Sequence, residues 1–411
     1  MTVLTLQQLT QSLAGKTVLV REDFNVPLSS NKDDSGAITD DTRIREGLET
    51  IQYLVKQQAK VVVLCHFGRP KGQVVESMRV APVAKRLGEL LGQEVLYSPD
   101  SLDNYEAFVA SVQLGQVALV ENTRFLPSEE KNDPELAKRF ATGVDIFVND
   151  AFGAAHRAHA STEGVAHHVP VAVAGFLMAR EIEALTPLVQ GPKQPFTAII
   201  GGSKVSTKIT VLENLLNTVQ HLIIGGGMTH TFNLALGGAV GNSLVEPDFV
   251  PTALRLLEQA KAKGVQVHLT TDVVTAQTIA ADADTKLSQS KAIPDGWEGL
   301  DAGPETLKVW ESVIGQSQTI LWNGPVGVFE VAPFAGGTRR IAELMAQATQ
   351  RGATTVLGGG DTVAAIGQFG MNPNAFTHVS TGGGASLEFL EGQVLPGIAA
   401  LNSSPALVTV S

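Results

Sequence analysis

Cysteine, long apolar runs and basic charge are all scarce in this sequence. The single cysteine, Cys65, cannot form a disulfide within the chain, so we expect a reducing compartment, the cytoplasm. No apolar run approaches the roughly 18 residues that span a bilayer, and residues 1–16 lack the basic start and apolar core of a signal peptide. A formal net charge of −11 argues against a basic nucleic-acid-binding face. We therefore expect neither a membrane nor a nucleic acid as partner.

The two common nucleotide-binding fingerprints are also missing. Residues 10–17 (TQSLAGKT) approach the pattern G-x-x-x-x-G-K-[ST], but they begin with Thr10 and precede their strand instead of following it. None of the glycine clusters continues as G-x-G-x-x-G. Neither a P-loop enzyme nor a dinucleotide dehydrogenase is supported.

Near-continuous apolar segments rich in Val, Ile and Leu alternate with stretches of helical period. Such strands are typical of a parallel sheet buried on both faces, and helices are expected at 81–91 and 250–264. A chain of 411 residues exceeds one comfortable hydrophobic core. The fold class we expect is α/β, with two doubly wound, Rossmann-like parallel-sheet domains. Residues 173–195 predict a helix followed by a Gly/Pro-rich break, so the boundary is expected near residue 185.

The two halves differ in the groups that they offer to a ligand. Residues 1–185 hold 10 of the 14 arginines and no Gly-Gly pair, whereas residues 186–411 hold Gly-Gly or Gly-Gly-Gly at 201, 225, 237, 336, 358 and 382. Four of these clusters follow an apolar strand, where open α/β sheets place their ligand crevice. Turn chemistry explains any single cluster equally well, but together they favour a nucleotide-type ligand.

The stretch 201–208 (GGSKVSTK) is the strongest phosphate candidate. Gly201 and Gly202 permit close backbone approach, and Lys204 and Lys208 lie on one face if a helix begins near Ser203. Two ammonium groups at a helix N-terminus oppose the macrodipole unless an anion binds there. The alternative, an exposed lysine pair, is left open by this stretch alone.

Two later glycine loops have similar alternatives. Asp361 follows a strand and three glycines, so it is either an N-cap or a ligand of Mg²⁺ beside a phosphate chain. The residues Gly382–Gly384 precede a helical stretch, where free N–H groups would cradle an anion.

Arginine and histidine follow several strands of the first half, in the stretches 21–27, 40–45, 65–72, 121–127 and 150–162. Any one of these groups is an ordinary surface ion pair. Several that converge would bind a small multiply charged acid, because Arg grips carboxylate and phosphate in a bidentate manner. The HRAH stretch lacks a second pair of ligands, so no metal is expected there.

Taken together, the motifs resemble the phosphoglycerate kinase family. The matching motifs occur in the same order as in the family and extend from residue 21 to 392. They are DFNVP, ITDDTRIR, HFGRPKG, ENTRF, VNDAFGAAHRAHAS, VAGFLM, GGSKVSTKI, IIGGGM, GWEGLDAGPET, WNGPVGVFE, GGGDTVAA and STGGGASLEFLEG.

This resemblance implies a monomeric two-domain kinase with a cleft and a hinge helix. Residues 1–185 would bind 3-phosphoglycerate, residues 186–392 would bind ATP or ADP with Mg²⁺, and residues 393–411 would return to the first domain. The implied reaction is reversible phosphoryl transfer between ATP and the carboxylate of 3-phosphoglycerate, giving ADP and 1,3-bisphosphoglycerate. Glycolysis, gluconeogenesis and the Calvin cycle use this step.

The resemblance also assigns roles to individual residues. For the acceptor it implies Asp23, Phe24, Asn25, Arg43, His66, Phe67, Gly68, Arg69, Arg124 and Arg157. For the nucleotide it implies Gly201, Gly202, Lys204, Lys208, Gly225, Gly226, Gly299, Asn323, Pro325, Val328, Glu330, Gly359, Gly360, Asp361 and Thr362, with Asp361 on Mg²⁺. The implied catalytic groups are Arg43, Lys204, Gly382, Gly383 and Gly384. An ionised carboxylate acceptor needs no general base, so positioning and charge neutralisation remain.

Three positions depart from the family pattern. Glu22 stands where an apolar residue is usual, so it either perturbs the charge beside Asp23 or faces solvent; Cys65 replaces a small hydroxyl residue, and Gln393 a common lysine. The rival enzyme is another ATP-dependent carboxylate kinase. A hinge-closing ligand-binding protein is the rival from another class, although the glycine clusters argue against it.

Overall fold

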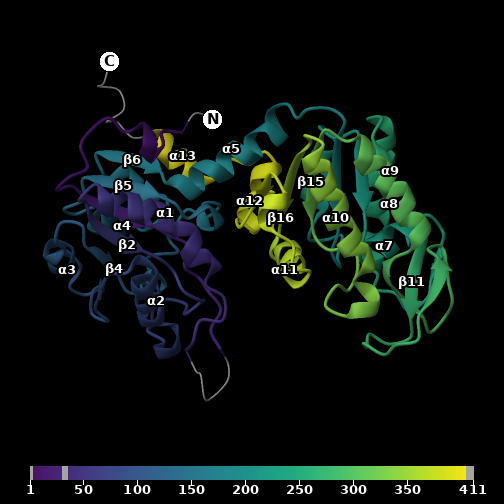
Figure 1. Ribbon diagram of the computed structural model, residues 1–411, viewed down its shortest axis with the longest axis horizontal. Helices are drawn as coiled ribbons and strands as arrows, with labels where there is room; N and C mark the ends of the chain where they lie inside the picture. Colours follow the sequence, from purple (N-terminus) through teal and green to yellow (C-terminus); the bar gives the residue numbers. More distant parts are fainter. Residues whose placement is uncertain (1–2, 30–35, 404–411) are drawn as a thin grey trace. The chain divides into compact units, whose positions relative to one another are not determined.

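The computed structural model describes residues 3–29 and 36–403. The chain divides into two compact units: unit 1 is Met1–Glu183 with Val394–Ser411, and unit 2 is Ala184–Gln393. Each unit contains a parallel six-stranded sheet flanked by helices (Figure 1). The predicted α/β class with two parallel sheets is therefore confirmed.

The sheet of unit 1 has the strand order β3-β4-β2-β1-β5-β6. Its strands are β1 (Thr17–Arg21), β2 (Lys60–Leu64), β3 (Val95–Tyr97), β4 (Val117–Leu119), β5 (Ile146–Asn149) and β6 (Val171–Ala174). Its helices are α1 (Thr42–Lys56), α2 (Ala81–Leu91), α3 (Tyr105–Ser111), α4 (Pro134–Phe140) and α13 (Pro396–Ala399). Since Arg21 pairs with both Leu64 and Asn149, the carboxyl ends of three central strands lie in line.

The sheet of unit 2 has the order β10-β8-β7-β15-β16-β17. Its strands are β7 (Phe196–Ile200), β8 (His221–Ile224), β10 (Gln266–His268), β15 (Thr319–Asn323), β16 (Thr354–Gly358) and β17 (His378–Val379). Its helices are α6 (Ile209–Leu215), α7 (Met228–Ala235), α8 (Val250–Ala262), α9 (Pro304–Gln316), α10 (Gly336–Gln350), α11 (Gly360–Gln368) and α12 (Gly384–Leu390). Asn323 pairs with Ile200 and with Gly358, so the loops after these strands leave the sheet at one edge.

Unit 2 also has small sheets that the apolar pattern does not predict. An antiparallel sheet joins β12 (Lys286–Gln289), β11 (Asp272–Ala276) and β14 (Glu298–Ala302), and a two-stranded sheet joins β13 (Ala292–Ile293) and β9 (Ala239–Val240). Strand β12 is almost wholly exposed, so it lacks the apolar signal by which the other strands are found.

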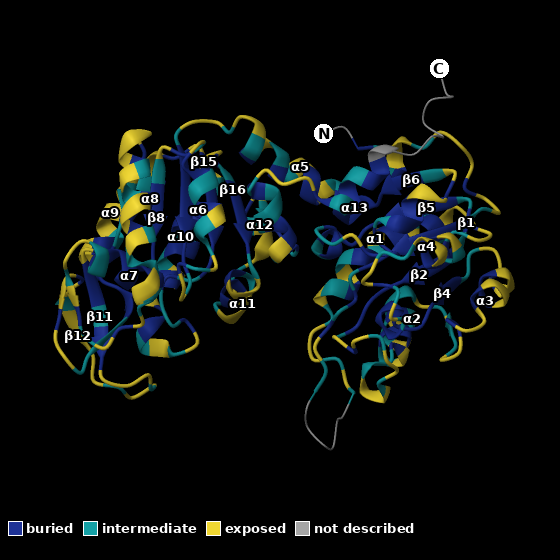
Figure 2. Cartoon of the chain, turned by 180° about the vertical axis from the view of Figure 1, so that it is seen from behind, coloured by how far each residue is buried: buried dark blue, intermediate teal, exposed yellow. Residues whose placement is uncertain are grey.

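Periodic burial explains the helices. The buried positions of α1 are Ile44, Gly47, Thr50, Ile51 and Leu54, which recur at intervals of three and one and so lie on one face of the helix. Figure 2 shows the same division along most helices, with buried residues toward the sheet and exposed ones away from it. The predicted helix 81–91 matches α2, whereas the one expected at 250–264 ends at Ala262 with left-handed Gly264 beyond it.

The boundary between the units falls inside helix α5 (Phe176–Gln190). The segment after Gln393 belongs to unit 1, where the N–H of Gly397 donates to the carbonyl of Ala155 at 2.9 Å. Asn149 Nδ2 donates to the carbonyl of Gly397 at 3.1 Å. Within the described ranges no helix is long and apolar enough to cross a membrane.

Candidate functional site

The loops after β1 and β2 and the first turn of α1 meet at the carboxyl edge of the unit 1 sheet. Arg43 Nη1 lies 2.6 Å from Asp23 Oδ2. The N–H of Gly68 donates to Asn25 Oδ1 at 2.9 Å, and Arg124 Nη1 donates to the carbonyl of Gly68 at 2.8 Å. Four motifs that are separate in the sequence are thus joined by side-chain contacts.

Arg21 is a further member of this edge that the resemblance does not single out. It is fully buried, and its Nε donates to Ser161 Oγ at 2.8 Å. Its Nη2 lies 3.2 Å from His66 Nδ1. Because guanidinium only donates, His66 accepts at Nδ1 and carries its proton on Nε2. Burial, reinforced by the charge of Arg21, lowers the pKa of His66 well below its usual value, so the ring is neutral at pH 7.

Several cations gather around His159. Burial and the charges of Arg21, Arg124 and Arg157 lower the pKa of this buried histidine to about 4. Such mutual repulsion is relieved when an anion binds among the cations. Arg157 Nε also donates to His156 Nε2 at 3.1 Å, and Arg124 Nε lies 3.2 Å from Glu130 Oε1.

The other acceptor candidates differ in exposure. Arg69 is exposed, whereas Phe24 and Phe67 are buried and pack in the core of unit 1. Asn122, a residue of the ENTRF motif to which no role was assigned, fixes the loop that carries Phe67. Its Oδ1 accepts from the N–H of Phe67 at 3.0 Å, and its Nδ2 donates to the carbonyl of Phe67 at 2.7 Å.

Glu22 corrects one expectation, since it does not face solvent. Glu22 is only 1% exposed. Burial, followed by repulsion from Asp150, holds the pKa of Glu22 well above its ordinary value. The departure from an apolar residue therefore places a carboxyl group in the core, where burial favours its protonated form.

In unit 2 the glycine loops pack backbone against backbone. A Cβ on Gly201 would lie 2.2 Å from the carbonyl oxygen of Pro325, and one on Gly226 would lie 2.6 Å from that of Gly202. The N–H of Gly201 donates to the carbonyl of Asn323 at 2.9 Å. Only glycine fits where these loop backbones come so close together, so the loops after β7, β8 and β15 form one glycine-lined edge.

The two lysines do not share a helix face, and the expectation of a helix start near Ser203 is wrong. Helix α6 begins at Ile209. The preceding loop is held elsewhere, because Ser206 donates from its N–H and its Oγ to the Glu246 carboxylate at 3.0 and 2.6 Å. Lys208 is half-buried and donates to Asn323 Oδ1, whereas Lys204 is exposed.

Lys208 belongs to a polar cluster with Asn323 and Asp361. Burial lowers the pKa of Lys208, and the nearby Asp361 partly opposes this. Asn323 is 1% exposed, and its Nδ2 has no hydrogen-bond partner in the described part of the chain. A Cβ on Gly359 would lie 3.0 Å from that Nδ2. An orphaned buried donor beside a glycine loop and a lysine suits an anionic ligand.

Asp361 is not the N-cap that one interpretation expected. Helix α11 begins at Gly360 with Gly359 as its N-cap, so Asp361 lies inside the first turn and is exposed. Thr362 is buried, and its Oγ1 accepts from the N–H of Gly324 at 2.7 Å. Among the described residues no three His, Cys, Asp or Glu side chains gather as a metal site.

The loop before α12 also needs a correction. The N–H of Gly382 donates to Ser380 Oγ at 3.2 Å, so it is not free as expected. Helix α12 begins at Gly384, and Gly383 is its N-cap with a φ of 55°. Of the predicted cradle, only the N–H groups of Gly383 and Gly384 therefore remain candidates for an anion.

Of the remaining nucleotide candidates, Gly299 lies in β14, Gly225 follows β8, and Val328 and Glu330 follow β15. Gly299 packs so closely on His230 that a Cβ would lie 2.3 Å from its Cε1, and His230 Nε2 lies 3.0 Å from the Gly299 carbonyl. The N–H of Val328 donates to the carbonyl of Leu300 at 2.9 Å. Gly225 packs on Val326, because a Cβ on residue 225 would lie only 2.7 Å from Val326 Cγ1. Glu330 is exposed.

Comparison with known proteins identifies similar chains over nearly the whole length. The family model described as phosphoglycerate kinase matches residues 6–393. A phosphoglycerate kinase of Acaryochloris marina is 54% identical over 393 residues, which cover 95% of this chain and 97% of the relative. One from Nostoc sp. is also 54% identical over 393 residues, with the same shares covered.

Solved structures give the same result. Phosphoglycerate kinase from Coxiella burnetii has a TM-score of 0.88 at 42% identity and covers 98% of this chain and 99% of its own. The enzyme from Pyrococcus horikoshii OT3 has a TM-score of 0.81 at 30% identity, with the same shares covered.

Proposed function

The chain belongs to the phosphoglycerate kinase family, which makes it a phosphotransferase with a carboxyl acceptor, and from that premise we propose which residues carry the reaction. The reaction is reversible transfer of the γ-phosphoryl group of ATP to the carboxylate of 3-phosphoglycerate. A different carboxylate kinase is not favoured, because the family match spans the chain. Neither is a protein that only binds its ligand.

We propose that 3-phosphoglycerate binds at the carboxyl edge of the unit 1 sheet. The observation that carries this is the cluster of Arg21, Arg124 and Arg157 around His159. Cations that crowd a mostly buried site, with Glu130 paired to Arg124, are well suited to a ligand with a phosphate and a carboxylate. Arg43, held by Asp23, and the exposed Arg69 would complete the grip, with the neutral His66 and Asn25 as hydrogen-bonding groups.

We propose that ATP or ADP binds at the glycine-lined edge of unit 2. Lys208 and the orphaned Nδ2 of Asn323 support phosphate binding beside Gly359, Gly360 and Thr362. Gly201, Gly202, Gly225, Gly226 and Gly299, with Pro325 and Val328, would line the adenosine side, and the exposed Glu330 would hold the ribose.

Mg²⁺ is proposed to accompany the nucleotide, with Asp361 as its protein ligand. An exposed carboxylate near Lys208 and the glycine loop fits a metal that keeps phosphate oxygens and waters as its other ligands. When bound, the ion would neutralise phosphate charge.

The transfer itself needs positioning and charge neutralisation, since the acceptor carboxylate is already ionised. We propose that Arg43, Lys204 and the N-terminal turn of α12 at Gly383 and Gly384 share the charge of the transferring group. The two bound substrates must meet and water must be excluded. Helix α5, in which the unit boundary falls, is the proposed hinge of that movement. We further propose a monomer that acts in the cytoplasm, as its family and its single buried cysteine suggest.

The test is a steady-state assay of the purified chain with 3-phosphoglycerate, ATP and Mg²⁺, in which hydroxylamine traps the acyl phosphate. Acetate replaces 3-phosphoglycerate in the control, and EDTA is added in another. The expected product requires 3-phosphoglycerate and disappears with EDTA. Turnover with acetate, or none with 3-phosphoglycerate, would overturn the assignment.

A further inference from the structure

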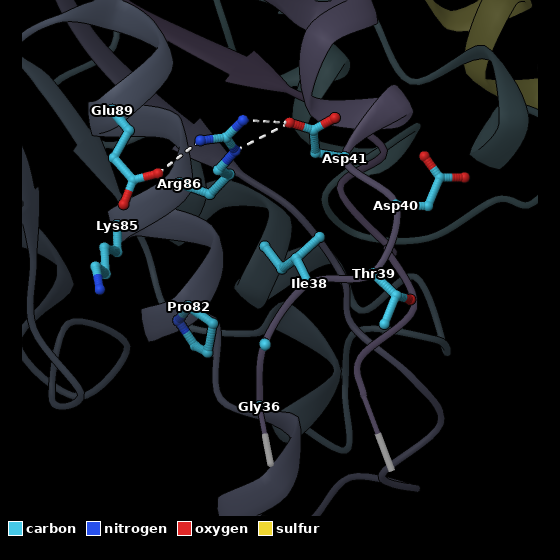
Figure 3. A pocket seen from close by; sticks show the side chains of 10 residues that line it. Gly36, Ile38, Thr39, Asp40, Asp41, Pro82, Lys85, Arg86 and Glu89 are labelled. Atoms are coloured by element: carbon cyan, nitrogen blue, oxygen red, sulfur yellow. Dashed lines mark hydrogen bonds and ion pairs between the residues drawn. The ribbon is translucent and has the colours of Figure 1, made fainter. Parts of the chain in front are cut away.

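Arg86 of helix α2 is partly exposed, yet all three nitrogens of its guanidinium donate to carboxylates. Its Nε and Nη2 both donate to Asp41 Oδ2, at 2.9 and 2.8 Å. Its Nη1 donates to Glu89 Oε2 at 2.6 Å (Figure 3). The guanidinium is therefore held in one orientation, with two of its donors on Asp41.

Asp41 is the residue from which helix α1 starts. It occupies the N-cap position, and its carbonyl accepts from the N–H groups of Ile44 and Arg45, both at 3.0 Å. Its Oδ1 accepts from Arg45 Nε at 2.8 Å. Arg86 thus ties the first turn of α1 to α2.

Apolar packing also joins the two helices, because Ile44 of α1 belongs to the same buried core as Val83 and Leu87 of α2. A cavity of about 500 Å³ lies between the segment 36–41 and α2, with Ile38 and Thr39 on one wall and Pro82 and Lys85 on the other (Figure 3). The Arg86–Asp41 contact lies along this cavity. Helix termini fray more readily than helix interiors, so the ion pair adds to the apolar packing of Ile44 in holding the first turn of α1.

Arg43 lies in the same turn, two residues after Asp41. Its side chain is 39% exposed and its guanidinium meets Asp23 at 2.6 Å. The direction of the first turn of α1 sets where this guanidinium lies. A small misplacement of a binding group lowers its effectiveness strongly, because its orientation is no longer fixed in advance.

We propose that Arg86 is a positioning residue for the acceptor: by holding Asp41 it fixes the first turn of α1 and, through it, Arg43. This inference rests on the proposed function of unit 1. Arg86 itself does not touch the substrate.

The test compares Arg86→Ala with Lys85→Ala, its exposed neighbour on the same cavity. Calorimetry gives the dissociation constants for 3-phosphoglycerate and for ATP, and melting curves report folding. We expect Arg86→Ala to weaken 3-phosphoglycerate binding about tenfold while ATP binding stays at the wild-type value. Lys85→Ala should match the wild type for both ligands.

A merely structural role is separated by two further variants. Arg86→Lys keeps the positive charge but not the planar guanidinium that donates to Asp41 through two nitrogens. It should give an intermediate loss of 3-phosphoglycerate affinity even if the alanine variant folds poorly. In an Arg43→Ala background, Arg86→Ala should add no further loss, since it acts through Arg43. The inference would be overturned, and the proposed function left standing, by any of three results. These are an additive loss of 3-phosphoglycerate affinity in the double variant, an equal loss of affinity for both ligands, or wild-type binding by Arg86→Ala. Wild-type protein that fails to bind 3-phosphoglycerate would overturn the proposed function as well.

Discussion

The carboxyl group of Glu22 lies directly against the Cα of Gly47. A Cβ on residue 47 would stand 2.7 Å from Oε2 and 3.0 Å from Oε1. Glu22 follows β1 and is buried, and Gly47 lies on the inner face of α1. Oε1 has no hydrogen-bond partner among the described residues. The buried acid is thus accommodated because its neighbour has no side chain.

Gly47→Ala should therefore destabilise unit 1. In an exposed helix the same change would stabilise by about 1 kcal/mol, but here the methyl group would stand 2.7 Å from a buried carboxyl that must shift, at a cost of about 1–3 kcal/mol. In a Glu22→Ala background the sign should reverse. Urea unfolding followed by circular dichroism measures both, with tryptophan fluorescence as the reference, because all three tryptophans lie in unit 2. Equal effects in the two backgrounds would contradict the contact.

The pH dependence of stability should change in Glu22→Gln. The unfolded carboxyl ionises near its ordinary pKa of 4.5, whereas burial and Asp150 raise the pKa in the folded chain. The folded state therefore binds more protons above pH 4.5, so its free energy of unfolding falls as pH rises through the raised pKa. Glu22→Gln should show a shallower fall over that range, whereas the exposed Glu94→Gln should follow the wild type. Parallel curves for Glu22→Gln and wild type would refute this.

Arg43→Ala and Lys204→Ala should lower kcat far more than they raise KM, because both groups are proposed to act on the transferring phosphoryl group. Loss of one such donor costs about 3 kcal/mol, or a hundredfold or more in rate. Both side chains are partly or fully exposed, so folding should survive. The exposed Lys261→Ala on α8 is the matched control. Near-normal kcat in either variant removes that residue from the proposed mechanism.

Gly201→Ala should damage unit 2, since its Cβ would lie 2.2 Å from one carbonyl oxygen and 2.5 Å from another. Backbone atoms cannot yield cheaply, and we expect a loss of about 1–3 kcal/mol in stability together with weaker ATP binding. Gly315→Ala, inside α9 with open space around it, should instead be neutral or stabilise by up to about 1 kcal/mol. Tryptophan-monitored urea unfolding gives the comparison. Similar stabilities for the two variants would show that the backbone around Gly201 can shift to admit a methyl group, and would contradict the prediction.

The fold was predictable where the signal is local. Continuous apolar strands and the period of α2 depend on neighbouring residues, and both were predicted well. The start of α6 was not, because Glu246, some forty residues later, holds Ser206 outside the helix. The exposed strand β12 lacks the apolar pattern altogether.

The candidate site shows the same limit. The loops of the two sheet edges could be listed from their motifs, but which side chains are buried depends on partners far along the chain. Glu22 is hidden because Gly47 makes room for it, and Arg21 is buried against Ser161 and His66. Asn122 holds the 66–68 loop through contacts that no local pattern signals.

The central claim is that each unit holds one substrate, and crossed calorimetry tests it most directly. Arg69→Ala removes an exposed cation from unit 1, and Lys208→Ala removes the partner of Asn323 from unit 2. We predict that Arg69→Ala weakens binding of 3-phosphoglycerate about tenfold or more and leaves ATP binding unchanged, and that Lys208→Ala does the reverse. Loss of both ligands in both variants, or exchange of the two effects, would contradict the assignment of substrates to units.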